Sequence, residues 1–170
     1  MNKVLARWNQ LPFADAVREI VPCCGSGSWA QGLAGRRPIA TEALLLASSD
    51  EIWRTLSRSA WLEAFDSHPR IGESASKAPV AAQSASWSQQ EQNSVSSANN
   101  AIKAGLATAN RAYEEKFGHI FIVCATGKSP SEILAILQRR MQNDTNAELR
   151  EAAEEQRQIT LLRLQKWLGI

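Results

Sequence analysis

Apolar residues recur at helical spacing along most of the chain. Between Thr41 and Leu56 they follow one another at mixed intervals of three and four residues, which predicts a strong amphipathic helix. The same spacing predicts shorter helices over residues 13–21, 29–33 and 59–66. The stretch 67–86 is rich in Ser, Ala and Pro, and it therefore predicts a long loop.

The second half of the chain predicts three more helices and one short apolar segment. From Ser88 the pattern predicts a single long helix that ends near Gly118. Its apolar stripe consists of Val95, Ala98, Ile102, Leu106, Ala109 and Tyr113. Phe121–Ala125 is too short for periodicity to separate a strand from a buried helical turn, and we favour an extended segment that crosses the core. Further helices are expected from Ser129 and Thr145, since each is followed three positions later by Glu, as in a capping box.

These patterns together predict an all-α fold. The helical segments do not alternate regularly with strands, as a parallel sheet would require, and no internal repeat is visible. A length of 170 residues is close to that of one domain. We therefore expect residues 1–170 to form a single-domain compact helical bundle with one short extended core segment near Phe121–Ala125.

Charge and composition narrow the classes of function. The net charge is 19 − 17 = +2 and the basic residues are scattered, so a nucleic-acid surface is not indicated. No apolar run approaches the roughly 20 residues that cross a bilayer, and no membrane partner is expected. The first residues lack the continuous apolar segment of a secretory signal, and the three cysteines, with Cys23 and Cys24 adjacent, offer no disulfide framework. These features favour the reducing cytoplasm.

No short motif in the sequence has the spacing that a phosphate-binding, dinucleotide-binding or zinc site requires. Gly127-Lys128-Ser129 is similar to the end of a phosphate-binding loop, but Ile122 stands where the earlier glycine is required. The dinucleotide fingerprint Gly-x-Gly-x-x-Gly is absent from the sequence. The two histidines, His68 and His119, lie far apart, and no paired cysteine spacing supports a zinc site. An enzyme built on this chain is expected to work without a metal or cofactor.

Glu91 is a carboxylate at a position where an apolar residue would be expected. It precedes Val95 by four residues and so extends the stripe of the predicted long helix toward the interior. Ser88-Gln89-Gln90-Glu91 also fits a capping box, in which Glu91 would only close the first helical turn. The pattern leaves both interpretations open.

Arg163 and His68 are two further candidates. Arg163 is four residues from both Ile159 and Trp167, and its planar fork suits a carboxylate, although a snorkelling Arg paired with an acid on a neighbouring helix fits the same pattern. His68 follows a predicted helix, and Pro69 stiffens the turn that presents its imidazole, a group suited to proton transfer near neutral pH. A single loop histidine is more often a bystander, and His119, inside an apolar run, is expected to be a core or rim residue.

Three segments, in this order, resemble a known family. They are His68-Pro69-Arg70-Ile71-Gly72-Glu73, Ser88-Gln89-Gln90-Glu91-Gln92 and the nine residues 121–129. Each motif alone is weak, but their ordered combination is similar to the 2-oxo-4-hydroxy-4-carboxy-5-ureidoimidazoline (OHCU) decarboxylases of urate breakdown. The resemblance extends over nearly the whole chain, from Leu11 to Arg163.

The resemblance implies an all-helical, cofactor-independent, usually homodimeric carboxy-lyase that converts OHCU to (S)-allantoin with loss of carbon dioxide. It implies His68 and Glu91 as the catalytic pair. It also implies a substrate-binding set made of Pro69, Ser88, Gln92, Arg163 and the backbone of Ile122, Val123 and Ala125. The sequence departs from the family pattern at His119, where an aromatic or apolar residue would be expected.

The implied chemistry agrees with the polar candidates. Decarboxylation leaves an electron pair on carbon, and the imine beside the carboxylated ring carbon of OHCU accepts it, so the substrate supplies its own electron sink. The protein has only to orient the carboxylate, manage the hydroxyl proton and protonate one face of the intermediate. Two alternatives remain at this stage: a helical ligand-binding or interaction module whose six tryptophans furnish core and partner surfaces, and a lyase or hydrolase acting on another ureide.

Overall fold

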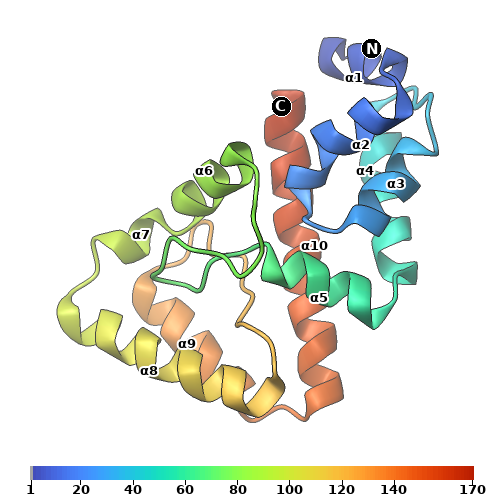
Figure 1. Cartoon of the computed structure of the whole chain (residues 1–170). Helices are drawn as coiled ribbons and strands as arrows, with labels where there is room; N and C mark the ends of the chain where they lie inside the picture. Colours follow the sequence, from blue (N-terminus) through green and yellow to red (C-terminus); the bar gives the residue numbers. More distant parts are fainter. Residues whose placement is uncertain (1) are drawn as a thin grey trace. The chain divides into compact units, whose positions relative to one another are not determined.

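The computed structural model describes residues 2–170, which form ten α-helices, one 3-10 turn and no strand (Figure 1). The all-α prediction is therefore confirmed. In chain order the elements are α1 (Lys3–Gln10), α2 (Phe13–Ile20), η1 (Val21–Cys23), α3 (Gly27–Ala34), α4 (Glu42–Thr55), α5 (Arg58–Asp66), α6 (Ala82–Glu91), α7 (Asn93–Ser96), α8 (Asn100–Phe117), α9 (Pro130–Arg140) and α10 (Thr145–Leu168).

The described residues divide into two compact units. The first comprises the chain up to Ala64 together with Arg157–Ile170, and the second comprises Phe65–Gln156. The first unit, here unit 1, has an aromatic core in which the rings of Trp8 and Trp167 meet edge to face with centroids 5.8 Å apart. The sequence patterns did not predict its helix α1. This helix is capped by Asn2, whose side chain accepts hydrogen bonds from the backbone amides of Val4 and Leu5.

The second unit, unit 2, has its core between α8, α9 and the segment that joins them. α8 and α9 run side by side (Figure 1). Their apolar faces enclose the segment Phe121–Ala125, all of which is buried and neither helical nor paired as a strand. The core residues are Ile71, Val95, Leu106, Tyr113, Phe117, Phe121, Val123, Ala125, Ile133 and Leu137. The prediction of a short non-helical core segment is confirmed.

The predicted single helix from Ser88 to Gly118 is wrong, because the structure divides this region into α6, α7 and α8. The break lies in the run of Asn and Ser residues at 92–100, whose side chains bond locally to the backbone in place of helical hydrogen bonds. Ser96 Oγ donates to Asn93 O at 2.7 Å, and Asn99 Oδ1 accepts from Ile102 N at 2.9 Å and thereby starts α8. The predicted loop 67–86 is also too long, since α6 begins at Ala82.

Helices α9 and α10 both begin where the sequence predicted, but only one of the two predicted capping boxes is confirmed. Ser129 and Glu132 form a capping box at the start of α9. At α10 the cap is Asp144, whose Oδ1 accepts from the amides of Asn146 and Ala147 at 2.9 Å, and not Thr145. A carboxylate here accepts two amide bonds and also favours the positive end of the helix dipole, which a threonine hydroxyl does not.

The capping box of α9 gives a first testable prediction. Replacing Ser129 with alanine removes the acceptor of the Glu132 amide, a bond of 3.2 Å. We expect the free energy of unfolding to fall by about 0.5–2 kcal/mol, measured by urea denaturation. The control Ser86→Ala, at an exposed position within α6, is expected to change it by less than about 0.5 kcal/mol. Equal effects of the two substitutions would contradict the capping role.

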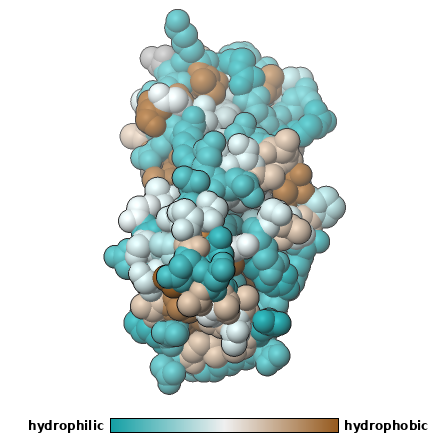
Figure 2. All heavy atoms as spheres, turned by 90° about the vertical axis from the view of Figure 1, so that its left-hand side faces the viewer, coloured by the Kyte–Doolittle hydropathy of each residue, from teal (hydrophilic) through white to brown (hydrophobic). Residues whose placement is uncertain are grey.

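No helix within residues 2–170 is long and apolar enough to cross a membrane. The face of the molecule drawn in Figure 2 is mainly hydrophilic, and its hydrophobic residues appear as small separate patches.

Candidate active site

His68 lies in a turn that directly follows α5 and is held inside unit 2. Its backbone amide donates to Phe65 O at 3.0 Å, and its side chain is only 7% exposed. Pro69 is buried beside it and pairs with Ser76 across an isolated bridge. Gly72, with a φ of +91°, lets the chain reverse after this turn. The turn therefore presents a buried imidazole from a rigid segment.

Arg70 fastens the same turn to α8. Its Nε and Nη2 donate to the two carboxylate oxygens of Glu114, each at 2.9 Å. A bidentate pair of this kind fixes the direction of both side chains as well as their separation. The ion pair raises the pKa of the Arg70 guanidinium through its hydrogen bond to Glu114. The position of His68 is thus set from both sides of the turn.

The imidazole of His68 contacts the side chain of Gln156 on α10. His68 Nε2 and Gln156 Oε1 are 2.7 Å apart, and Gln156 is fully buried. Sequence reasoning missed Gln156, because it sits in the highly polar run Glu154-Glu155-Gln156-Arg157-Gln158, which has the composition of a solvated helix face. The signal that could have found it lies outside the run, because Gln156 is three residues before Ile159 and seven before Arg163 and so shares their face of the helix.

Glu91 is the last residue of α6, and Ser88 lies one turn before it. Ser88 therefore does not cap this helix, and the capping-box interpretation of Glu91 is wrong. Ser84, Ser88 and Glu91 are spaced by four and three residues, so they share one face of α6, on which the two serines are buried. Glu91 is half-buried on that face. The carboxylate does point to the interior side, although on a different helix from the predicted one.

The segment Phe121–Ala125 is held by charged side chains of α9, of α10 and of the turn that precedes α9. Arg140 Nη1 donates to Ile122 O at 2.6 Å, and Glu155 Oε2 accepts from Cys124 N at 2.6 Å. Lys128 Nζ donates to Cys124 O at 2.7 Å. These bonds fix the backbone of alternate residues of the segment. The intervening Val123 is buried, and its backbone N–H and C=O make no hydrogen bond to other described residues.

Electrostatics link the segment to the end of α6. Burial raises the pKa of the Cys124 thiol, Lys128 lowers it, and the carboxylates of Glu155 and Glu91 raise it. Glu91 is therefore close enough to the segment to act on Cys124. Since Glu155 bonds to Cys124 and the adjacent Gln156 bonds to His68, one turn of α10 contacts both the segment and the catalytic candidate.

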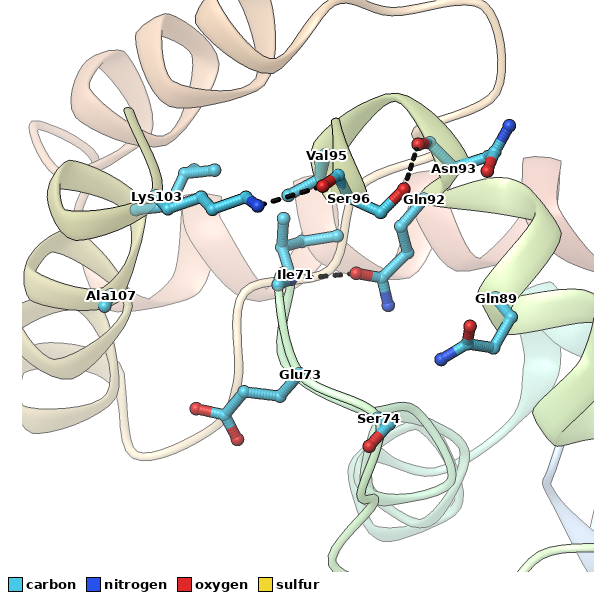
Figure 3. Close-up of a pocket in the computed structure, with 12 residues that line it drawn as sticks. Ile71, Glu73, Ser74, Gln89, Gln92, Asn93, Val95, Ser96, Lys103 and Ala107 are labelled. Atoms are coloured by element: carbon cyan, nitrogen blue, oxygen red, sulfur yellow. Dashed lines mark hydrogen bonds between the residues drawn. The ribbon is translucent and has the colours of Figure 1, made fainter. Parts of the chain in front are cut away.

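Gln92 connects α6 to the turn after His68 and lines a pocket of about 410 Å³ (Figure 3). Its Oε1 accepts from Gly72 N at 2.8 Å, the dashed line near Ile71 in the figure. The carboxylate of Glu73 and the amide of Gln89 border the same space. Of the predicted site residues only Gln92 lines this pocket, which is therefore not the space around His68 and Glu91.

Arg163 is a residue of unit 1. It is fully buried, so the snorkelling interpretation is wrong, and its Nη1 donates to Pro22 O at 3.2 Å. His119, as predicted, is a core residue, and its ring packs at tilted and edge-to-face angles among the rings of Phe65, Tyr113 and Phe117. Among the described residues, no group of three or more His, Cys, Asp or Glu side chains is placed to hold a metal ion.

Unit 2 thus contains a buried imidazole, a half-buried carboxylate and a buried stretch of backbone in which the N–H and C=O of Val123 make no hydrogen bond to other described residues. An imidazole and a carboxylate are the usual carriers of protons in enzyme reactions. Backbone N–H and C=O groups that have no partner and lie away from water cost free energy, which a polar ligand would recover. This arrangement is suited to binding a small, hydrogen-bonding molecule and moving its protons.

Comparisons with known proteins agree on one family. The family profile described as OHCU decarboxylase matches residues 9–165. The "uric acid degradation bifunctional protein TTL" of Arabidopsis thaliana is 35% identical over 145 residues, which is 85% of this chain and 44% of that protein. The 2-oxo-4-hydroxy-4-carboxy-5-ureidoimidazoline decarboxylase of Haloferax volcanii is 26% identical over 153 residues, 89% of this chain and 86% of that protein.

The chain spans less than half the length of two of these relatives, 44% of the Arabidopsis protein and 32% of a "uric acid degradation bifunctional protein" from a Bacillus species. Among solved structures, the chain is similar to OHCU decarboxylase in the presence of (S)-allantoin, with a TM-score of 0.77 and 32% identity over 89% of this chain and 98% of that one. The structure of (S)-allantoin synthase shares the fold at a TM-score of 0.72 and 20% identity, over 96% of this chain and 53% of that one.

Proposed function

Because the chain belongs to the OHCU decarboxylase family, we propose that it decarboxylates 2-oxo-4-hydroxy-4-carboxy-5-ureidoimidazoline and releases (S)-allantoin. The observation that carries the proposal is the similarity to the solved OHCU decarboxylase crystallised with (S)-allantoin, which covers 98% of that chain. The grouping of His68, Glu91 and the segment Phe121–Ala125 in unit 2 supports it, since these are the groups that the reaction requires.

The reaction breaks the bond between ring carbon 4 and the carboxylate. The electron pair left on carbon 4 forms a double bond to carbon 5, and the imine nitrogen takes up the displaced pair together with a proton. The enol produced then loses its hydroxyl proton and gains a proton on one face of carbon 5. One carbon dioxide leaves and one proton is consumed overall, so that no oxidant or reductant is needed.

We assign the proton transfers to the two catalytic candidates. His68 accepts a hydrogen bond from the hydroxyl group while carbon dioxide leaves, and it takes the hydroxyl proton when the enol becomes a carbonyl. Glu91 delivers a proton to carbon 5. His68 is held by its turn before the substrate arrives, and the backbone of Glu91 is placed by the last turn of α6. Delivery from one fixed side accounts for a single product enantiomer.

Substrate binding falls to the polar groups around this pair. Ser88 and Gln92 bond the ureido and ring nitrogens, and the backbone of Ile122, Val123 and Ala125 bonds the ring amide and carbonyl groups. Pro69 shapes the turn that carries His68. Arg163 holds a carboxylate or ring carbonyl through charge-assisted hydrogen bonds, a task that suits a fully buried guanidinium.

The proposal also covers the domain organisation, the oligomeric state and the cellular location of the protein. We infer that the 170 residues act as one domain, since the continuous helix α10 contributes to both units. We further infer a homodimer in the cytoplasm, bound to neither nucleic acid nor membrane. A cytoplasmic location is supported by Cys23, Cys24 and Cys124, which are thiols in the described structure. Analytical ultracentrifugation that finds a monomer at micromolar concentration would refute the dimer.

The function is tested by circular dichroism of OHCU generated in situ from urate by urate oxidase and hydroxyisourate hydrolase. Spontaneous decay gives racemic allantoin and therefore no lasting signal. With this protein added, we expect a stable signal of (S)-allantoin. Unchanged decay to the racemate, in the presence of folded protein, would refute the decarboxylase.

Glu91→Gln tests the proton donor. The substitution keeps the size and hydrogen-bonding capacity of the side chain but removes its acidity, so we expect turnover to fall about 100-fold or more. The far-ultraviolet circular dichroism of the variant should show the same helical content, because Glu91 ends α6 and does not cap it. Glu115→Gln, an exposed position on α8, is the matched control and should leave turnover unchanged. Turnover within twofold of the unmodified protein in Glu91→Gln would exclude Glu91 as the donor.

A further inference from the structure

The contact between His68 and Gln156 joins two buried side chains that lie 88 positions apart in the chain. From it we propose that Gln156 is a positioning residue, which holds His68 in the tautomer protonated on Nε2 and leaves Nδ1 as the basic nitrogen. The inference about Nδ1 as the base rests on the proposed function, whereas the assignment of the tautomer does not.

The argument begins with the atoms that meet. The amide oxygen of a glutamine side chain can only accept a hydrogen bond. Gln156 Oε1 lies 2.7 Å from His68 Nε2, so Nε2 must be the donor and must carry a hydrogen. A neutral imidazole has one N–H and one lone pair, and the lone pair is then on Nδ1. In the proposed reaction the nitrogen that would receive the hydroxyl proton of the substrate is then Nδ1.

The location of Gln156 makes it an effective support. It is fully buried on α10, and the preceding residue, Glu155, accepts the 2.6 Å hydrogen bond from Cys124 N. Adjacent residues of one rigid helix thus set the direction of the His68 ring and the position of the segment Phe121–Ala125. A displacement of α10 would move the His68 ring and the segment Phe121–Ala125 together. The position of the proposed base is therefore linked to the position of the backbone that is proposed to bind the substrate.

An amide at position 156 also suits a base better than a carboxylate would. A carboxylate bonded to Nε2 would stabilise the charged imidazolium and raise the pKa of His68, so that the ring would be protonated before it meets the substrate. A neutral amide orients the ring and adds no charge. The residue next to Gln156 is Glu155. Its carboxylate accepts a hydrogen bond from the backbone amide of Cys124.

The tautomer is tested without any substrate. In uniformly ¹⁵N-labelled protein, long-range ¹H–¹⁵N correlation spectra show which ring nitrogen of each histidine carries the proton. The chain has two histidines, so the spectrum of His119→Phe assigns the signals of His68. We expect neutral His68 to be protonated on Nε2 alone. Protonation on Nδ1 would overturn the proposal, since the amide would then be donating to the ring.

Two substitutions at Gln156 test the same contact by its effect on the His68 pKa, followed in the same spectra. Gln156→Glu is expected to raise the pKa by about 1 pH unit or more, because the carboxylate favours the imidazolium. Gln156→Leu removes the acceptor and is expected to lower it. A rise in Gln156→Leu would show that the amide donates to the ring and would overturn the proposal. Gln138→Glu, which adds the same charge at an exposed position on α9, should leave the pKa unchanged.

Kinetics then separate this inference from the proposed function. In Gln156→Glu the rising limb of the kcat/KM profile should move to higher pH together with the His68 pKa. In Gln156→Leu kcat should fall about 10-fold, because the ring loses the hydrogen bond that orients it, by analogy with the partners that orient metal-bound histidines. A purely structural role would lower the amount of folded enzyme but leave the midpoint in place. If no variant, nor the unmodified protein, forms (S)-allantoin, the function fails. If activity is present but its pH midpoint ignores Gln156→Glu, the positioning role fails.

Discussion

Replacing His68 with asparagine is expected to slow the formation of (S)-allantoin at least about 100-fold, the usual contribution of a positioned general base. Asparagine keeps a polar group that can donate to Gln156 but has no titratable nitrogen. The turn should stay intact although asparagine is smaller than histidine. It is held by the backbone hydrogen bond from residue 68 to Phe65 and by the ion pair of Arg70 with Glu114. The measurement is the circular dichroism signal of the product, with the helical content of the variant checked in the far ultraviolet.

The control for this prediction is the other histidine. His119 lies among the rings of Phe65, Tyr113 and Phe117, and it is the position at which the sequence departs from the family pattern. His119→Phe keeps a ring of similar size there, so turnover should remain within about threefold of the unmodified protein. If His119→Phe abolished the reaction and His68→Asn did not, the assignment of the base would be wrong.

Periodicity and capping signals predicted much of the fold. The helix predicted from Thr41 to Leu56 is α4, and the capping box predicted at Ser129 is present at the start of α9. Both features depend on residues that are neighbours within one helical turn. The break after Glu91 was not predicted. Apolar residues keep a helical spacing through this break. The helix is interrupted because Asn and Ser side chains form hydrogen bonds to the nearby backbone.

The candidate site was predicted unevenly for a related reason. The family resemblance singled out His68 and Glu91, and hydrophobicity alone indicated that the segment Phe121–Ala125 is buried. The side chains that hold these groups in place, Gln156 and Arg140, lie in polar runs of α10 and α9. Composition makes such runs look solvated, although helical spacing from Ile159 and from Leu137 places Gln156 and Arg140 on the inward faces.

Glu148→Gln is expected to destabilise the protein by about 3–5 kcal/mol, because it leaves the buried charge of Arg140 without its counter-ion. Both side chains are completely inaccessible to solvent, and Arg140 Nε and Nη2 contact Glu148 Oε1 at 2.8 and 2.5 Å. The Tyr113 hydroxyl donates to the same oxygen, and burial raises the pKa of that phenol. Arg140 also stacks on Phe121, so the network reaches the segment that is proposed to bind the substrate. Urea denaturation measures the loss.

The neighbouring ion pair of Arg139 with Glu151 is the matched control, because it joins the same two helices at 2.5 Å but its side chains are 59% and 31% exposed. Arg139→Ala should therefore cost no more than about 1 kcal/mol. The double substitution Arg140→Met with Glu148→Leu should cost less than Glu148→Gln, since no buried charge remains without a partner. It would still raise KM, because Ile122 O loses the 2.6 Å bond from Arg140 that fixes the segment. If Glu148→Gln proved no worse than Arg139→Ala, the buried pair would not be what holds this segment.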